Sequence, residues 1–201
     1  MGVSELGEPE LIRVTMIDYF TSEVLIDKLV YPDIPMEHLN TRYSGVSYQQ
    51  LNQAQRNRNC FKGKRAAREA VWEYVGPKTF IIGHSAQNDL AALRIIHRNV
   101  LDTFDLEHRL LEKERQRVIT SAAMTENHSS EEDLQQNISS PSSTATDGKK
   151  KVKGSGALSL KTAAKSHLNR DIQSNQSHDS REDAFATRDL ARWHVLNFDS
   201  P

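Results

Sequence analysis

Hydrophobic and polar positions alternate in two runs near the N-terminus. The runs Leu11–Phe20 and Glu23–Val30 are rich in Val, Ile, Leu and Tyr, and Thr21 and Ser22 lie between them. Such runs, separated by turn residues, are typical of β-strands. We therefore predict an antiparallel hairpin. It should end at Tyr31–Pro35, because proline cannot donate a hydrogen bond to a strand ladder.

Helical spacing appears further along the chain. Within Arg65–Tyr74 the positions Ala66, Ala70, Val71 and Tyr74 share one face. We predict the other elements in this order: a polar connection over 36–59, a strand over 79–82, a helix over 89–97 that buries Leu90, Leu93 and Ile96, a strand over 99–103, and helices over 106–118, 158–168 and 183–196. The last helix offers Ala184, Ala186, Leu190 and Trp193 for burial. Strands interleaved with helices predict an α/β domain with a mixed sheet.

The segment 119–155 has a different composition. Ser, Thr, Asn, Gln, Asp and Glu dominate it, and it contains no aromatic residue. Such a segment buries too little apolar surface to offset chain entropy, so we predict a disordered polar insertion between the domain parts 1–118 and 156–201. Lysines at Lys149–Lys151 and Lys153 close it. They fit a nuclear-localisation patch, a phosphate contact or, as the simplest interpretation, a solvated loop edge.

Charge and hydropathy limit the function classes. The formal net charge of the 201 residues is -1, so any nucleic-acid contact must rest on a local basic patch. The hydrophobic fraction of 37% is low for a compact domain, in keeping with a partly unpacked chain. The sequence has one cysteine, which excludes an internal disulfide.

Three short clusters carry acidic residues next to predicted element ends. Asp89 opens a helix after an apolar strand, Asp102 ends a short strand, and Asp183 opens the last helix five positions after His178. Each acid has a simple structural interpretation, since carboxylates near helix N-termini serve as caps. Taken one at a time, the clusters favour that interpretation.

Taken together, the clusters resemble the DEDDh exonucleases of the ribonuclease-H-like superfamily, in particular the eukaryotic RNA exonuclease branch. Five segments in the family's order carry the resemblance: TRYSGV at 41–46, IIGHSAQNDLAAL at 81–93, IHRNVLDT at 96–103, SLKTAAKSHLNRDIQ at 159–173 and HDSREDA at 178–184. The resemblance implies a ribonuclease-H-like mixed sheet flanked by helices. It also implies hydrolysis of RNA from the 3′ end by two divalent ions, Mg²⁺ or Mn²⁺, with single-stranded DNA as a further substrate class.

The same resemblance assigns roles to individual residues. Asp89 and Asp183 would bind the metal ions, and His178 would be the general base. The imidazole suits that role because it titrates near neutral pH. His84 and Asp102 would support the site, Asp102 as a hydrogen-bond anchor. Weaker candidates for nucleic-acid contact are Arg42, Ser44 and Asn88. The resemblance and the lysine run together predict a nuclear or nucleolar location and a role in RNA or rRNA processing.

The family's remaining two acids lie two positions apart on the first, central strand, in an Asp-Cys-Glu-Met segment. This chain begins Met1-Gly2-Val3, so we expect that strand and its acids to be absent, and activity to be impaired. Two explanations are open: a truncated product, or a degenerate homologue. The intact later motifs favour truncation. The alternative function is a non-catalytic module that binds RNA or a protein, and a third possibility is a fragment that does not fold.

Overall fold

A hairpin of two long strands forms the centre of the molecule. The computed structural model describes residues 1–126, 158–173 and 178–197. Strands β3 (Arg13–Ile17) and β4 (Val24–Tyr31) pair antiparallel, with Thr15 opposite Asp27. The predicted hairpin is therefore confirmed. On its other edge β4 pairs in parallel with β6 (Cys60–Lys62), a strand that the sequence did not suggest.

The other strands form two further sheets. Strand β1 (Gly2–Ser4) lies between β2 (Pro9–Glu10) and β5 (Met36–His38), antiparallel to both. Strands β7 (Ile81–Gly83) and β8 (Val100–Asp102) are parallel. Within the described residues β4 lies between β3 and β6, so β3 pairs only with β4. Strand β7 pairs only with β8. The expected absence of a central strand stays a prediction.

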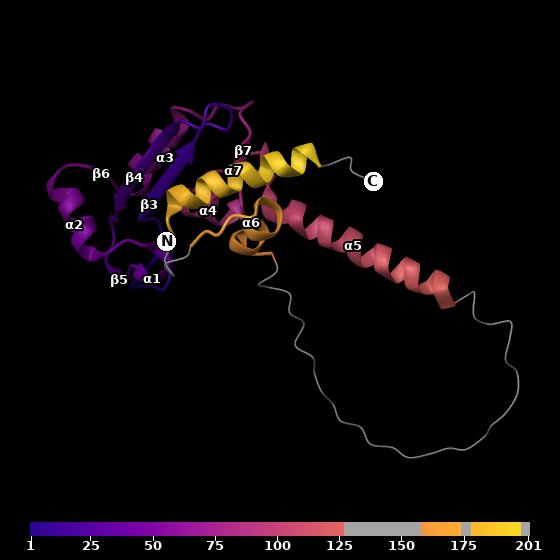
Figure 1. The fold of residues 1–201 in the computed structure, drawn as a ribbon. Helices are drawn as coiled ribbons and strands as arrows, with labels where there is room; N and C mark the ends of the chain where they lie inside the picture. The colour runs from indigo at the N-terminus through magenta and orange to yellow at the C-terminus, as the bar shows by residue number, and fades with distance from the viewer. Residues whose placement is uncertain (127–157, 174–177, 198–201) are drawn as a thin grey trace, which may run out of the picture.

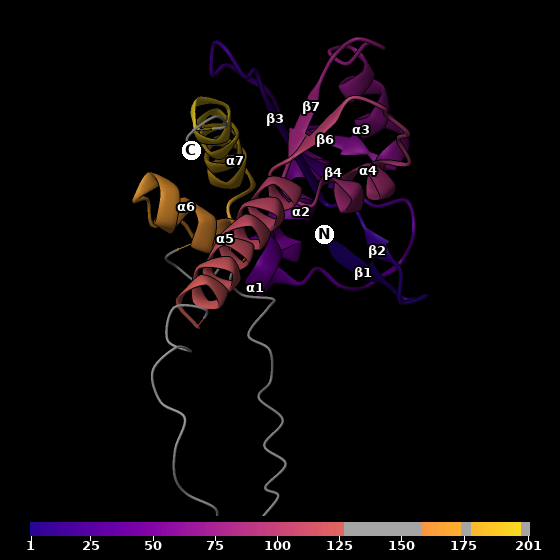
Figure 2. The same ribbon diagram turned by 90° about the vertical axis from the view of Figure 1, so that its right-hand side faces the viewer.

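Helices cover the strands on two sides. They are α1 (Thr41–Ser44), α2 (Tyr48–Arg56), α3 (Gly63–Trp72), α4 (Ala86–Leu93), α5 (Thr103–Glu126), α6 (Leu160–Leu168) and α7 (Ser180–Leu196). Figure 1 shows α7 lying across β3 and β7, and α5 pointing away from the rest of the domain. In the view of Figure 2, α3 and α4 lie on one side of the strands, and α6 and α7 on the other. The α/β class is thereby confirmed, with both parallel and antiparallel strand pairs.

Two apolar clusters hold the layers together. One packs β3 and β4 against α3 and the end of α4, with Val30 and Ala67 fully buried. The other joins α6 to α7 through Ala164, Ile172 and Leu190, which are all inaccessible to solvent. This second cluster fixes the position of α7. The HDSREDA segment lies at the N-terminal end of that helix.

Several sequence predictions need correction. The stretch 36–59 is no plain connection, because it contains β5, α1 and α2. Helix α4 covers 86–93 where 89–97 was expected, so Ile96 lies beyond it and is 95% exposed instead of buried. Tyr74 is exposed for the same reason, since α3 ends at Trp72.

The predicted disordered insertion over 119–155 is wrong for its first part. Helix α5 continues to Glu126, so 119–126 is helical, and 127–155 lies outside the described residues together with the lysine run. In the last helix Ala186 and Leu190 are buried as predicted, whereas Ala184 and Trp193 are only partly buried. No helix in the described part of the chain is both long and apolar enough to cross a membrane.

Candidate active site

The first candidate aspartate lies in a helix whose N-terminus is capped from a distance. Helix α4 follows β7 through a tight turn, where a Cβ on Gly83 would lie 2.5 Å from that of Ala86. Its N-cap residue, Ser85, is left-handed at φ 60° and makes no side-chain cap. Asp102, at the end of β8, caps the helix instead, accepting hydrogen bonds from the backbone N–H groups of Ser85 (2.8 Å) and Ala86 (2.7 Å). Two neighbouring parallel strands thus place Asp89 in the first turn of α4.

The carboxyl group of Asp89 has an unusual electrostatic environment. The residue as a whole is exposed, yet neighbouring protein atoms displace water from its carboxyl group. This desolvation raises the pKa of Asp89. The amino group of Met1 lowers the pKa of Asp89, and the carboxylate of Asp102 raises it. No described residue donates a hydrogen bond to Asp89, so the carboxyl group is available to a ligand.

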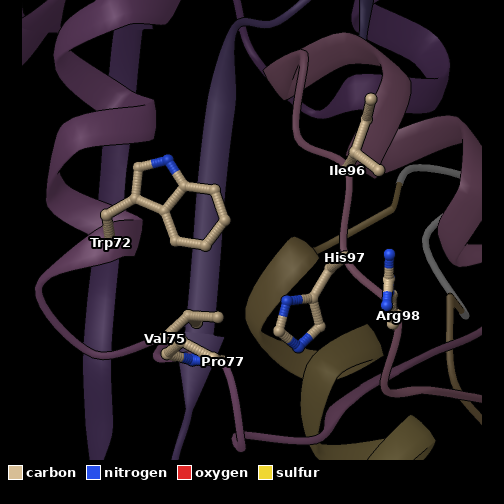
Figure 3. Close-up of a pocket in the computed structure, with 6 residues that line it drawn as sticks. All are labelled: Trp72, Val75, Pro77, Ile96, His97 and Arg98. Atoms are coloured by element: carbon tan, nitrogen blue, oxygen red, sulfur yellow. The ribbon is translucent and has the colours of Figure 1, made fainter.

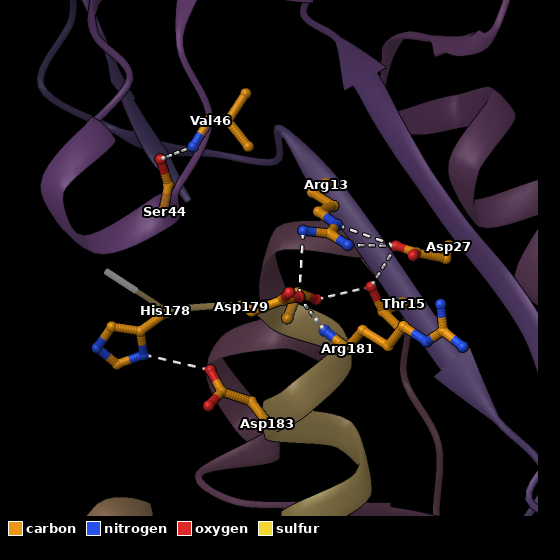
Figure 4. Close-up of polar contacts among 10 residues, drawn as sticks. Arg13, Thr15, Asp27, Ser44, Val46, His178, Asp179, Arg181 and Asp183 are labelled. Carbon is orange, nitrogen blue, oxygen red and sulfur yellow. Dashed lines mark hydrogen bonds and ion pairs between the residues drawn. The ribbon is translucent and has the colours of Figure 1, made fainter. Parts of the chain in front are cut away.

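The second candidate aspartate lies in a helix that caps itself. Asp179 is the N-cap residue of α7 and accepts a hydrogen bond from the backbone N–H of Arg181 at 2.9 Å. Asp183, in the first turn, is held on both oxygens. Gln173 donates to Oδ1 at 2.9 Å, and Nδ1 of His178 lies 3.3 Å from Oδ2 (Figure 4). The structure therefore brings His178 and Asp183 together, as the resemblance implies.

The N-terminus of α7 is tied to β3. The hydroxyl of Ser180 donates to that of Thr15 at 2.7 Å, and Arg13 lies 3.4 Å from Asp179 and 2.8 Å from Asp27 (Figure 4). Arg13 and Thr15 both lie on β3, the strand that α7 crosses. These contacts fix the position of His178 and Asp183 relative to the sheet.

His84 lies under the turn that precedes α4. Its Nδ1 is 3.0 Å from the hydroxyl of Thr103, and its Nε2 is 2.9 Å from the carbonyl oxygen of Leu158. A carbonyl can only accept, so Nε2 carries the proton. Burial lowers the pKa of His84, which makes the neutral ring the favoured form. His84 thus joins the ends of β7 and β8 to the start of α6, and its supporting role in the site stays a prediction.

The three weaker candidates differ in their contacts. Arg42 is exposed, with its guanidinium 5.9 Å from the centre of the Tyr43 ring. The hydroxyl of Ser44 is used inside its own loop, donating to the carbonyl of Leu39 at 2.8 Å and accepting from the N–H of Val46 at 3.2 Å. Asn88 is exposed on α4. Contact with nucleic acid stays a prediction for all three.

The acidic residues do not assemble into a metal centre within the described residues. No group of three or more His, Cys, Asp or Glu side chains is placed there to hold an ion. Asp89 and Asp183 occupy the N-terminal turns of two different helices and share no hydrogen-bond partner. Of the two candidate metal ligands, Asp183 is thus paired with a histidine, His178, while Asp89 lies apart from it.

Sequence reasoning missed a buried carboxylate that joins three helices. Glu107 of α5 accepts hydrogen bonds from His194 of α7 at 2.7 Å and from His167 of α6 at 3.0 Å. Burial alone would raise the pKa of Glu107, but the two histidine hydrogen bonds outweigh it and hold the pKa below its ordinary value. The His167 ring also lies 3.9 Å, centre to centre, from Trp193. Nothing in the local pattern could have revealed this cluster, because His167 and His194 lie 60 and 87 residues from Glu107 in the sequence.

Two surface pockets differ in their relation to these residues. One is lined by Trp72, Val75, Pro77, Ile96, His97 and Arg98 (Figure 3). It lies at the starts of β7 and β8, whereas Asp89 and Asp102 lie at their ends, so it is separate from the candidate site. The other pocket includes Arg13, Lys28, Gly45 and Val46 in its lining. It adjoins the N-terminus of α7 through the contact of Arg13 with Asp179.

Comparison with known proteins finds relatives that are named RNA exonucleases. RNA exonuclease 3 of Emericella nidulans is 30% identical over 217 residues, covering 96% of this chain and 27% of the relative. RNA exonuclease 1 of Saccharomyces cerevisiae is 27% identical over 197 residues, covering 98% of this chain and 27% of the relative. RNA exonuclease 3 of Candida albicans is 37% identical over 103 residues, covering 51% and 23%. The chain therefore spans about a quarter of the length of these relatives.

Solved structures share the fold. The Pan2 pseudoubiquitin hydrolase–RNA exonuclease module of Saccharomyces cerevisiae, in complex with AAGGAA RNA, matches with a TM-score of 0.62 at 18% identity, over 96% of this chain and 26% of that one. The Pan2 catalytic unit of Neurospora crassa matches with a TM-score of 0.61 at 20% identity, over 94% and 25%. No protein-family model matches the chain.

Proposed function

We propose that this chain, which belongs to the DEDDh 3′–5′ exonuclease family of the ribonuclease-H-like superfamily, contributes to the removal of nucleotides from the 3′ end of RNA. The observation that carries the proposal is the pairing of His178 with Asp183 at the start of α7. It occurs in a chain related over almost its whole length to RNA exonucleases.

The geometry suits His178 to take a proton from an attacking water molecule. A carboxylate can only accept, so Nδ1 of His178 carries the proton in the 3.3 Å contact with Asp183. The neutral ring then leaves Nε2 unprotonated and able to accept. The side chain is 46% exposed, so a substrate can reach it. Gln173 holds the other oxygen of Asp183 and so limits rotation of the carboxylate that orients the ring.

The family uses divalent ions such as Mg²⁺ or Mn²⁺, whose preferred ligands are carboxylate oxygens. Asp89 and Asp183 are the candidates for this role. The described residues alone do not fit a centre for two such ions, because no cluster of three or more ligands is present among them. Two carboxylates would also neutralise only half the charge of two divalent ions. We therefore propose that activity of this chain by itself is strongly reduced.

The names of the relatives support RNA as the substrate class. Their names specify RNA, and we propose RNA as the substrate, with single-stranded DNA as a weaker candidate. Lys28 and Arg13, which line the pocket beside α7, are the candidate cations for a phosphate backbone near the site, and Arg13 is also paired with Asp27 and Asp179. A nuclear or nucleolar location, with a role in RNA or rRNA processing, belongs to the same proposal.

The test uses single-stranded RNA labelled at either end, with the protein in excess and Mg²⁺ or Mn²⁺ added. With a 5′ label, products should shorten one nucleotide at a time. With a 3′ label, the label should leave first as a mononucleotide. Asp183→Ala should abolish both signals. Internal cuts, or unchanged shortening by the Asp183→Ala protein, would contradict the proposal.

A second function is favoured by the incomplete set of metal ligands. The chain would then bind RNA or a protein partner without cutting RNA. In that case RNA affinity would fall as salt rises, and no product would form at any concentration of Mg²⁺ or Mn²⁺. Circular dichroism and a melting curve on the same sample establish that the protein is folded.

A further inference from the structure

The loop around Gly45 is a rigid unit built from its own hydrogen bonds. Helix α1 is a single turn whose flanking residues, Asn40 and Gly45, are both left-handed. The hydroxyl of Thr41 donates to the carbonyl of Val46 at 2.9 Å, and the hydroxyl of Ser44 bridges the carbonyl of Leu39 and the N–H of Val46. Val46 and Leu39 are buried in an apolar cluster, so the loop is anchored to the body of the domain.

The backbone of His178 rests directly on this loop. Its N–H donates to the carbonyl oxygen of Tyr43 at 3.2 Å. A Cβ atom on Gly45 would lie 2.7 Å from the carbonyl oxygen of His178, closer than real Cβ contacts allow. The peptide groups on both sides of the His178 Cα are therefore held against 43–45. Figure 4 shows Ser44 and Val46 of the loop on the side of His178 opposite α7.

We propose that Gly45 is a positioning residue for His178. Its missing side chain lets the two backbones approach, and this approach, together with the Tyr43 carbonyl, directs the imidazole toward Asp183. The inference rests on the proposed function, because it gives the imidazole a purpose. It adds that the TRYSGV segment serves catalysis through His178, and not only by contact with RNA.

The chain offers a matched control for this idea. Gly45 and Gly7 are both left-handed, at φ 68° and 76°, so an alanine at either position meets similar backbone strain. A Cβ on Gly7 would meet nothing within 4 Å, whereas one on Gly45 meets the His178 carbonyl. The difference between the two alanine variants isolates the contact with His178 from the strain. A Gly45→Asn variant adds a further check, because asparagine tolerates the left-handed region but still carries a Cβ.

The experiment measures amide hydrogen exchange of His178 by NMR in the wild-type chain and in the Gly45→Ala, Gly45→Asn and Gly7→Ala variants. We expect both Gly45 variants to speed exchange of the His178 N–H by about tenfold, as for loss of one ordinary hydrogen bond. Gly7→Ala should leave that rate within about twofold of wild type. An unchanged rate in both Gly45 variants, or the same change in Gly7→Ala, would overturn the proposal. If Gly45→Ala does not fold, Gly45→Asn decides.

Cleavage of RNA then separates positioning from plain structure. Gly45→Ala should lower the single-turnover rate by about ten- to a hundredfold, with little change in RNA affinity. In a His178→Ala background the same substitution should have no further effect, whereas an additive loss would overturn the positioning role. The exchange result needs no activity. Altered exchange in a protein that never cuts RNA would therefore reject the proposed function while keeping the backbone contact.

Discussion

The N-termini of α4 and α7 look alike in sequence but are held in different ways. Each helix carries an aspartate as its fourth residue, Asp89 in α4 and Asp183 in α7. Helix α7 is capped by the adjacent Asp179, whereas α4 is capped by Asp102, at the end of a neighbouring strand. Asp183 is held by two donors, while Asp89 has none among the described residues. One helix end is specified locally and the other by tertiary structure.

This difference bears on the roles proposed for the two carboxylates. Asp183 is oriented by Gln173 and in turn orients His178, so its charge acts partly through the imidazole. Desolvation raises the pKa of Asp89, and the nearby Met1 amino group lowers it. In the proposed function Asp183 would therefore orient the imidazole as well as bind a metal ion, whereas Asp89 would bind a metal ion alone.

The largest effect on stability is expected from Asp102→Ala, which removes the cap of α4. The substitution removes the acceptor for three backbone N–H groups, those of Ser85, Ala86 and Phe104. We expect the free energy of unfolding to fall by about 2–4 kcal/mol, measured by urea denaturation. Asp102→Asn keeps one acceptor oxygen and should lose less. An Asp102→Ala protein as stable as wild type would show that α4 does not depend on this cap.

A smaller loss is expected at the self-capped helix. Asp179→Ala removes one N-cap hydrogen bond and the 3.4 Å ion pair with Arg13, from a side chain that is 61% exposed. The free energy of unfolding should fall by about 1 kcal/mol in the same denaturation experiment. Asp179→Ser, which can still cap, is the control. A larger loss of unfolding free energy in Asp179→Ala than in Asp102→Ala would contradict the expectation that the distant cap of α4 contributes more stability than the local cap of α7.

Local patterns accordingly predicted α7 and its site better than α4. The hairpin β3–β4 and helices α6 and α7 follow from periodicity and turn residues, and Asp179 stands where a cap is expected. Helix α2 was missed, although Ser47 and Gln50 form a capping box whose spacing is visible in the sequence. The distant cap of α4 was not predictable from sequence in this detail, because Asp102 lies 17 residues from Ser85 and only the pairing of β7 with β8 brings them together.

The smallest effect on stability is expected from the titration of His84, which lies beneath α4. Its folded-state pKa lies below the ordinary value of 6.5, so the unfolded chain takes up the proton at a higher pH than the folded chain. The stability that His84 contributes is therefore complete above the ordinary pKa and decreases as pH falls below it. The His84→Gln side chain can still donate to Leu158. As pH falls from about 7.5 to 5.5, the urea midpoint of this variant should decrease less than that of the wild-type protein. Identical pH profiles would contradict a buried neutral His84.

The most direct test of the central claim, that His178 and Asp183 act as one unit in cutting RNA from the 3′ end, is a double-mutant cycle. Single-turnover shortening of RNA in Mg²⁺ or Mn²⁺ would be measured for wild type, His178→Gln, Asp183→Asn and the double variant. We expect each single variant to lose most of the rate and the double variant to be no slower than the slower single one. Independent, multiplicative losses, or wild-type rates in either single variant, would contradict it.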